Sequence, residues 1–176
     1  TNMRYLGFLY LGLMIDQNNE IKVLEYNCRM GDPETQNLMI YLENMGIDFL
    51  NLLIDKKHDG NSDCNLDYFN EKKHYSCTLV LAARGYPNTY KKDFYIDLSD
   101  INESENLKIF HAGTIMEDGR IKSVGGRILT INTFGSDRQK CIDLAYENIK
   151  KIRTYIDKEF RNEDNKLTFF REDIGE

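Results

Sequence analysis

Three polar side chains alternate along residues 23–29, VLEYNCR. In an extended strand, residues two positions apart point to the same face, so Glu25, Asn27 and Arg29 are expected on one side. That side would present a carboxylate, an amide oxygen and a guanidinium in a row. The opposite side would carry Leu24, Tyr26 and Cys28.

This polar row suits a divalent metal ion and the phosphate that accompanies it. Mg²⁺ takes oxygen ligands and usually shares its coordination shell with substrate phosphates. An arginine can bind phosphate or carboxylate oxygens through two parallel hydrogen bonds. The alternative is an amphipathic strand whose polar side faces water. Asn is disfavoured in strands, which argues for a role of Asn27, but the residues alone leave both interpretations open.

A predicted helix start follows at Gly31, Asp32, Pro33 and Glu34. Asp is a favoured N-cap, proline is favoured at the first helical position, and an acid is favoured in the first turn. Backbone N–H groups at such a start can face an anion. We interpret Asp32 as a cap rather than a catalytic acid, and expect the helix to end near Asn44.

A predicted hairpin positions the polar row. Residues 6–15 (LGFLYLGLMI) are almost continuously apolar, which predicts a strand buried on both faces. Residues 16–20 (DQNNE) have the composition of a hairpin loop. Residues 21–29 are the returning strand.

The chain changes character after these elements. Residues 47–57 predict a second helix, and residues 58–65 (HDGNSDCN) are rich in linker residues. The predicted domains are residues 1–60 and residues 76–176, joined by a linker over residues 61–75. One face of the second helix would carry Ile47, Leu50, Leu53 and Ile54.

The second predicted domain is rich in strands. Strands are expected over residues 76–84, 107–114 and 127–134. Residues 85–88 (GYPN) predict a turn after the first of them, and residues 117–119 (EDG) predict a hairpin turn between short strands.

A long helix is expected after these strands. Ser136 or Asp137 would cap it, and it would run to about Phe160. The tail, residues 167–174, predicts an edge strand. The fold class is therefore α+β: an antiparallel sheet with helices, then a small β-rich domain with a long helix. The apolar residues that recur at helical spacing are Cys141, Ala145, Ile149, Ile152 and Ile156.

Composition narrows the function classes. The 176 residues are 41% hydrophobic and 30% charged, as in a soluble globular protein. The net charge is 23 − 29 = −6. An acidic chain without a basic cluster is a poor candidate for binding nucleic acid or an anionic membrane, so neither is expected as a partner.

The cysteines and the amino-terminal end suggest part of an intracellular protein. Cys28, Cys64, Cys77 and Cys141 form no C-x-x-C pair, so we interpret them as small apolar residues in a reducing compartment. The apolar residues 5–15 are too short to span a bilayer, which needs about 20 residues, and they lack a signal peptide's basic leader. The abrupt start in an apolar run is expected of a fragment.

Residues 23–36, VLEYNCRMGDPETQ, resemble the E-(F/Y)-N-C-R-(F/M)-G-D-P-E-(T/S)-Q run of the phosphoribosylamine–glycine ligases. The E-x-N-x-R core is also similar to that of other ATP-grasp enzymes. The resemblance covers nearly the whole chain and implies the second half of an ATP-grasp lobe followed by the family's carboxy-terminal domain. Further similar segments are residues 5–15, 79–90 (LVLAARGYPNTY), 110–114 (FHAGT), 124–131 (VGGRILTI) and 170–176 (FREDIGE).

The resemblance also implies roles for the motif residues. Glu25 and Asn27 would bind Mg²⁺ or Mn²⁺. Arg29 would be the catalytic residue that contacts the triphosphate or an acyl phosphate. The substrate site would be bordered by Gly31, Asp32 and Pro33.

The implied reaction joins glycine to 5-phosphoribosylamine at the expense of ATP, in the cytoplasm. Glycine would become glycyl phosphate, which the sugar amine would attack to give glycinamide ribonucleotide, ADP and phosphate. The amino-terminal domains of such an enzyme, which hold ATP and much of the substrates, are not recognisable here. The chain alone is therefore expected to be inactive and to bind ATP weakly, with an apolar face of residues 6–15 exposed.

Two alternatives remain beside this reading. One is another ATP-grasp carboxylate–amine ligase, and the other is a non-catalytic interaction module derived from the ligase. Among other candidates, we interpret His58 and His74 as surface residues and His111 as a packing or backbone-orienting residue rather than a catalytic one. Arg127, after Gly125 and Gly126, could line a phosphate nest, but a salt-bridging arginine in a tight turn is favoured.

Overall fold

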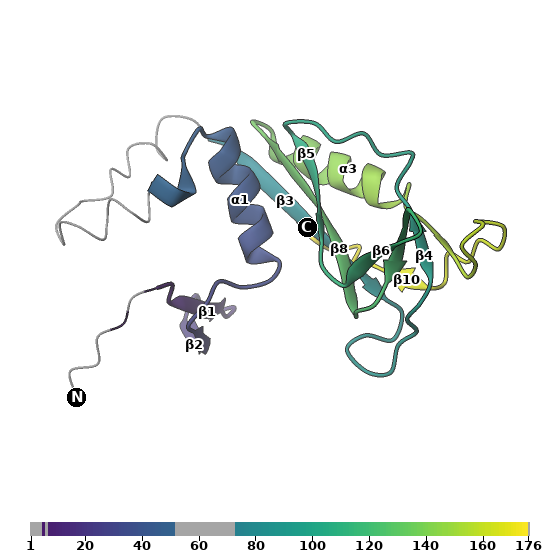
Figure 1. The fold of residues 1–176 in the computed structure, drawn as a ribbon. Coiled ribbons are helices and arrows are strands. Elements are labelled where there is room, and N and C mark those ends of the chain that lie inside the picture. Colours follow the sequence, from purple (N-terminus) through teal and green to yellow (C-terminus); the bar gives the residue numbers. More distant parts are fainter. Residues whose placement is uncertain (1–4, 6, 52–72, 176) are drawn as a thin grey trace. The chain divides into compact units, whose positions relative to one another are not determined.

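The computed structural model describes residue 5 and residues 7–51 and 73–175 (Figure 1). The chain forms two compact units, Thr1–Thr35 and Gln36–Glu176. The predicted linker lies largely outside the described residues, so the predicted domain boundaries stay a prediction. The same holds for most of the predicted second helix, for Cys64 and for His58. Within the described ranges, no helix is long and apolar enough to cross a membrane.

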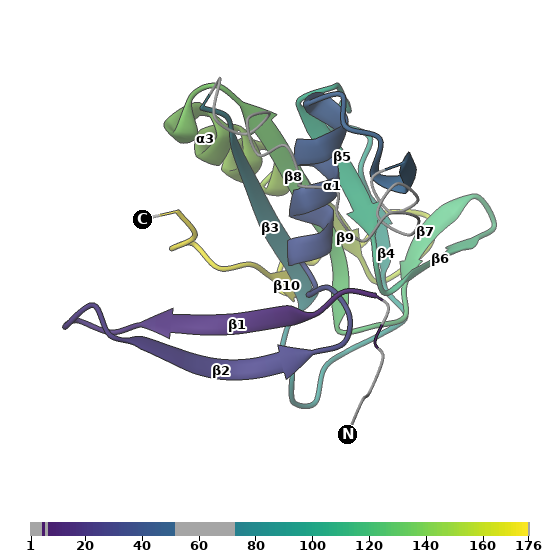
Figure 2. The ribbon, with the colours of Figure 1, turned by 90° about the vertical axis from the view of Figure 1, so that its left-hand side faces the viewer.

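The first unit contains the predicted hairpin. Strand β1 (Tyr10–Ile15) pairs with strand β2 (Ile21–Asn27) in antiparallel fashion (Figure 2). The turn is held by Asp16, whose Oδ1 accepts hydrogen bonds from the backbone N–H of Asn18 at 2.8 Å and of Glu20 at 3.0 Å. The predicted hairpin and its polar loop are confirmed, because Asp and Asn close such turns through their side chains.

A β-bulge divides β2 into two parts. Gly12 is opposite Glu25 but Leu13 is opposite Val23, so Leu24 is the extra residue. A bulge residue interrupts the simple alternation of faces. Residues directly opposite each other share a face, so Glu25 keeps the face of Gly12 while Val23 takes the face of Leu13. One face therefore collects Leu11, Leu13, Ile15, Ile21, Val23 and Tyr26, here called the apolar hairpin face.

The apolar hairpin face is exposed in this chain. Leu13 is 48% exposed, and Ile15, Ile21 and Tyr26 are each 66% exposed. The prediction of a strand buried on both faces is therefore wrong for the chain as it stands, because among the described residues β1 pairs with β2 alone. The companion prediction, an exposed apolar surface on residues 6–15, is confirmed for the described residues of that range.

The second unit is built around a four-stranded antiparallel sheet of order β10-β3-β8-β5. Two helices accompany it. Helix α1 (Glu34–Asn44) contacts the sheet through Tyr41, whose ring packs edge-on against Phe134, and helix α3 (Arg138–Ile149) contacts β3 and β8. The strands are β3 (Tyr75–Ala83), β5 (Leu107–His111), β8 (Arg127–Gly135) and β10 (Thr168–Phe169).

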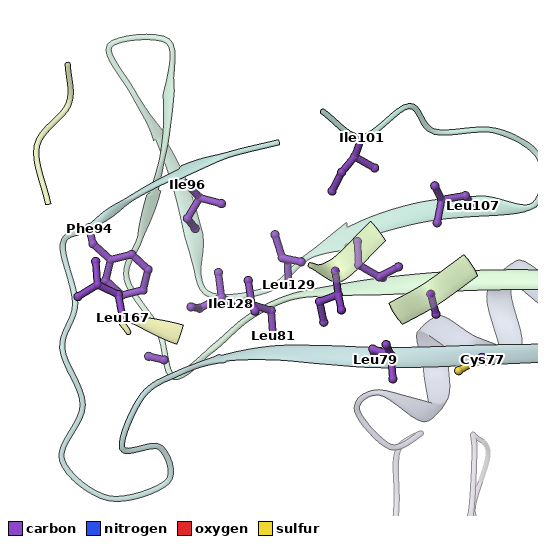
Figure 3. Close-up of a cluster of buried hydrophobic side chains, with 14 of the residues drawn as sticks. Cys77, Leu79, Leu81, Phe94, Ile96, Ile101, Leu107, Ile128, Leu129 and Leu167 are labelled. Carbon is purple, nitrogen blue, oxygen red and sulfur yellow. The ribbon is translucent and has the colours of Figure 1, made fainter. Parts of the chain in front are cut away.

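The main core lies on the α3 side of this sheet. Leu79 and Leu81 of β3 are opposite Ile131 and Leu129 of β8, and all four are almost completely buried (Figure 3). Ala145, on the predicted apolar face of α3, is also fully buried. Burial of such side chains stabilises the fold by about 1.5–3 kcal/mol each.

A second four-stranded sheet has the order β6-β7-β4-β9. The predicted hairpin turn joins β6 to β7, with Asp118 at φ 50° and Gly119 at φ 74°, as a tight hairpin turn requires. Strands β4 and β9 were not predicted, because strands of three residues carry little pattern. The bounds are β4 (Tyr95–Asp97), β6 (Thr114–Glu117), β7 (Arg120–Ser123) and β9 (Arg153–Tyr155).

Helix α3 is shorter than predicted. Asp137 caps its start by accepting a hydrogen bond from the backbone N–H of Lys140, as expected. The helix ends at Ile149 rather than near Phe160, because the following residues pair with β4 as strand β9. Ile152 still packs against the core, but Ile156 is 49% exposed, so its predicted place on the helix was wrong.

The predicted strand over residues 107–114 is divided between the two sheets. It leaves the first sheet after His111 and enters the second at Thr114. Gly113 makes this crossing possible, because a Cβ there would lie 2.6 Å from the Cα of Gly125 and the carbonyl oxygen of Arg127. Strands β3 and β8, and the edge strand β10, occur where the sequence predicted them.

Candidate metal and phosphate site

Glu25 and Asn27 lie on one face of the hairpin. Glu25 is opposite Gly12 and Asn27 is opposite Tyr10, two positions apart on each strand. A Cβ on Gly12 would lie 3.1 Å from Cγ of Glu25, so the Glu25 side chain crosses the space that glycine leaves empty. The two oxygen donors predicted from the sequence therefore point to the same side, and Glu25 is exposed while Asn27 is half-buried.

Arg29 lies beyond the end of the strand. Strand β2 ends at Asn27, and the guanidinium of exposed Arg29 donates a hydrogen bond to the carbonyl of Met30 at 3.1 Å. The alternation that places Glu25 and Asn27 together therefore does not extend to Arg29. Its predicted contact with phosphate stays a prediction.

The loop after the strand is fixed by the first turn of α1. The carbonyl of Gly31 accepts hydrogen bonds from the backbone N–H of Thr35 at 3.0 Å and from its hydroxyl at 2.5 Å. Gly31 is buried, Asp32 is exposed and Pro33 is half-buried. Asp32, the middle residue of the loop, is thus exposed to solvent, while the backbone before it is held by the hydrogen bonds to Gly31.

Tyr10 and Glu34 join this group, although sequence reasoning assigned neither a place in the site. The Tyr10 hydroxyl donates to Oε1 of Glu34 at 3.4 Å. The negative charge of Glu34, then partial burial, raises the pKa of Tyr10, and the charge of Glu25 contributes as well. Tyr10 therefore stays a protonated donor at neutral pH, close to both carboxylates. The register of the hairpin, which no local pattern reveals, was needed to find it.

Glu25 and Asn27 together fit a metal ion whose other coordination positions are filled by water or substrate. Within the part of the chain that the structure describes, no three His, Cys, Asp or Glu side chains gather to hold a metal ion. A carboxylate from Glu25 and an amide oxygen from Asn27 are compatible with Mg²⁺, which commonly binds one or two protein ligands together with water and phosphates.

The remaining candidates have local partners. His111 ends β5 and forms a 2.9 Å hydrogen bond with the hydroxyl of Thr114. His74, predicted at the surface, is half-buried and stacks on Phe134 with ring centroids 5.1 Å apart. Arg127 donates to the hydroxyl of Tyr86 at 3.1 Å. None of these contacts assigns a catalytic role.

The cysteines differ in their surroundings. Cys77 and Cys141 are buried and free, as predicted for small apolar residues, whereas Cys28 is exposed. Burial raises the pKa of the Cys77 thiol to about 11. A thiol with so high a pKa is not a nucleophile at neutral pH.

Comparison with known proteins assigns both ends of the chain to one kind of synthetase. Residues 76–176 match the family described as phosphoribosylglycinamide synthetase, C domain. Residues 1–35 match the ATP-grasp (A) domain of the same synthetase. The second of these matches contains Glu25, Asn27 and Arg29.

Individual proteins similar to this chain belong to the same kind of enzyme. The chain is 39% identical over 171 residues to the phosphoribosylamine–glycine ligase of Leptospira interrogans, covering 97% of this chain and 36% of that protein. The corresponding ligase of Vibrio parahaemolyticus is 43% identical over 150 residues, covering 84% and 33%. The crystal structure of the ligase from Thermotoga maritima is similar with a TM-score of 0.64 and 29% identity, covering 94% and 36%. The chain thus spans about a third of the length of these relatives.

Proposed function

Because the chain belongs to the phosphoribosylglycinamide synthetase family, we propose that it is the part of a phosphoribosylamine–glycine ligase that carries the metal-binding strand. The reaction would join glycine to 5-phosphoribosylamine and convert ATP to ADP and phosphate, in purine biosynthesis. The supporting observation is the position of Glu25 and Asn27 on one hairpin face, with Gly12 leaving room for the carboxylate.

The chemistry explains why such a site needs charge and positioning above all. A carboxylate is a poor acylating agent because its leaving group would be oxide, and a phosphoryl group transferred from ATP makes phosphate the leaving group instead. The glycine carboxylate attacks the γ-phosphorus, and the amine of phosphoribosylamine then attacks the carbonyl carbon of glycyl phosphate. Protein groups contribute mainly by orienting the reactants and offsetting charge.

Each residue of the site has a role in this proposal. Glu25 and Asn27 would hold Mg²⁺ or Mn²⁺, and the ion would offset the repulsion between the triphosphate and the glycine carboxylate. Arg29 would bind oxygens of the transferred phosphoryl group. The substrates would be bordered by the loop of Gly31, Asp32 and Pro33.

The proposal includes the partners of this chain. The remaining domains of the ligase would supply the ATP pocket and most of the contacts to glycine and phosphoribosylamine. The apolar hairpin face supports this arrangement, because a two-stranded ribbon with an exposed apolar side is not stable on its own. The cytoplasm is the proposed compartment.

The test is mutation of the two proposed metal ligands in the full-length ligase that contains residues 1–176. Glu25→Ala and Asn27→Ala should each lower kcat by about 10²–10³-fold, the usual cost of one fixed electrostatic contact, with an unchanged unfolding temperature. The measurement is ADP release with glycine and phosphoribosylamine as a function of Mg²⁺ concentration.

Two residues of the hairpin turn serve as matched controls. The Glu20 side chain is 64% exposed and its carboxylate pairs with exposed Lys22, and Asn18 occupies the same turn. Glu20→Ala and Asn18→Ala should keep near-normal turnover. A folded Glu25→Ala enzyme with near-normal kcat would refute the proposed metal site.

A further inference from the structure

Two glycines in the first unit leave their side-chain space to glutamate side chains. At Gly12 a Cβ would approach Cγ of Glu25 to 3.1 Å. At Gly31 a Cβ would overlap the carboxylate of Glu34. The side chains of Glu25 and Glu34 therefore each lie directly over a backbone that only glycine leaves open. One of these glycines is in β1, and the other is in the loop that leads to α1.

Tyr10 lies close to both places. Its ring Cε1 is 3.6 Å from the position of a Gly12 Cβ, and its hydroxyl donates to Glu34. Glu34 in turn covers Gly31, whose carbonyl is held by Thr35. A chain of contacts thus runs from the face with the proposed metal ligands to the loop proposed to border the substrates.

We propose that Tyr10 and Glu34 are positioning residues that form a latch, meaning the hydrogen bond between the Tyr10 hydroxyl and the Glu34 carboxylate. The latch would hold the loop of Gly31 and Pro33 at a fixed distance from Glu25. We assign Glu34 to the loop because its Oε1 accepts the hydrogen bond from Tyr10 and its Oε2 lies over the Gly31 backbone. This inference rests on the function proposed above.

The latch matters because the proposed chemistry depends on position. A displacement of about 1 Å at a reacting centre can cost on the order of 10²-fold in rate. Strand β1 and the loop belong to different parts of the sequence, and a side-chain hydrogen bond between them limits their relative movement. Loss of the latch should therefore lower kcat while leaving the binding of ATP largely unchanged.

Three substitutions in the full-length ligase separate the hydrogen bond from the charge. Tyr10→Phe removes the hydroxyl and keeps the ring. Glu34→Ala removes the acceptor, whereas Glu34→Gln keeps an acceptor oxygen without the charge. We expect kcat to fall about 10-fold in Tyr10→Phe and in Glu34→Ala, and less than about 3-fold in Glu34→Gln, with KM for ATP within about 2-fold of wild type.

A double substitution tests whether the two residues act as one unit. Tyr10→Phe combined with Glu34→Ala should be no slower than Glu34→Ala alone, because both remove the same bond. If the decreases in kcat of the two single variants multiplied in the double variant, the latch would be overturned. So would a Glu34→Gln enzyme as slow as Glu34→Ala, since the charge itself would then be required.

Tyr95 provides a matched control for the loss of a tyrosine–carboxylate bond. Its hydroxyl donates to Oε2 of Glu117 at 2.6 Å within the sheet of β4, β6, β7 and β9. Tyr95→Phe should lower the unfolding temperature with unchanged kcat. Tyr10→Phe should lower kcat with an unchanged unfolding temperature. Wild-type kcat in Tyr10→Phe, beside an inactive Glu25→Ala, would overturn the latch alone. An active Glu25→Ala enzyme would overturn the proposed function instead.

Discussion

At the scale of single residues, the proposed site depends on a residue that has no side chain, Gly12. Glu25 can extend across the hairpin because Gly12 opposite it lacks a side chain. Tyr10, two positions before Gly12, faces the same side of the hairpin, and its hydroxyl reaches Glu34 at the start of α1. The absence of a Cβ thus contributes to the proposed site as directly as the carboxylate does.

Replacement of Gly12 by valine should therefore disable the site without unfolding the protein. Valine suits a strand, but its Cβ would stand 3.1 Å from Glu25 Cγ and push the carboxylate aside. We expect kcat of the full-length ligase to fall at least about 10-fold, with little change in unfolding temperature.

Gly119 supplies the contrasting substitution. It has φ 74° and no atom within 4 Å of its Cβ position, so Gly119→Ala should cost about 1 kcal/mol of stability through backbone strain and leave kcat unchanged. Equal kcat for Gly12→Val and wild type would show that Glu25 does not need this space.

At the scale of elements, the bulge at Leu24 sorts the hairpin into two chemically different faces. Without it, strict alternation would place Ile21 and Val23 on the same face as Glu25. The extra residue transfers them to the side of Leu13. Bulges are frequent next to active sites, where they redirect a side chain, and this one separates the proposed metal ligands from the apolar hairpin face.

Lysine at Leu13 should reduce the exposed apolar surface of residues 1–176. We expect the fluorescence of a dye that binds apolar patches to fall roughly two-fold in Leu13→Lys, because the residue is at the centre of that face. Met14, 54% exposed on the other face, is the matched control, and Met14→Lys should change the signal much less. Equal decreases in both variants would argue against a continuous apolar face.

The pairing of β4 with β9 predicts a pH-dependent stability. Asp97 Oδ2 accepts a hydrogen bond from Arg153 at 2.8 Å, and its Oδ1 accepts one from the Ser99 N–H. Burial opposes ionisation, but the hydrogen bonds from Ser99 and the charge of Arg153 outweigh it and lower the pKa of Asp97 below 3.8. A lowered pKa stabilises the folded state above the unfolded-state value and loses that contribution as the pH falls.

Asp97→Asn should therefore cost about 1 kcal/mol at pH 7, and the difference from wild type should shrink as the pH falls below about 4. Urea unfolding at a series of pH values measures it. Asp100, which is 56% exposed and also pairs with Arg153, is the control, and Asp100→Asn should cost less. A cost independent of pH would contradict the ion pair as its source.

At the scale of the whole molecule, the chain corresponds to 36% of the length of the Leptospira interrogans and Thermotoga maritima ligases. The proposed site residues lie in residues 25–33, whereas the well-packed core lies in the second unit. The proposed chemistry would therefore need surfaces that other domains of the ligase contribute.

Residues 1–176 alone should bind Mg·ATP weakly. We expect no heat of binding in calorimetry at micromolar concentrations and no ADP release with glycine and phosphoribosylamine. Addition of the remaining domains as a separate polypeptide should restore ADP release if the pieces associate. Micromolar binding of Mg·ATP by residues 1–176 alone would contradict this expectation.

The sequence by itself determined the elements whose signals are local. The segments 76–84 and 127–134 predicted β3 and β8, the Asp-Gly pair predicted the turn between β6 and β7, and Asp137 marked the start of α3. The motif from Glu25 to Pro33 likewise indicated the family, because its residues are neighbours in the chain. Such signals need no knowledge of what packs beside them.

Only the tertiary structure decided what depends on distant partners. Helix α3 stops at Ile149 because the next residues pair with β4, and the predicted strand after Leu107 divides where Gly113 meets Gly125. The bulge at Leu24 and the contact of Tyr10 with Glu34 depend on strand register. Pairings of this kind are fixed by backbone hydrogen bonds and side-chain packing between remote segments, which a local pattern does not contain.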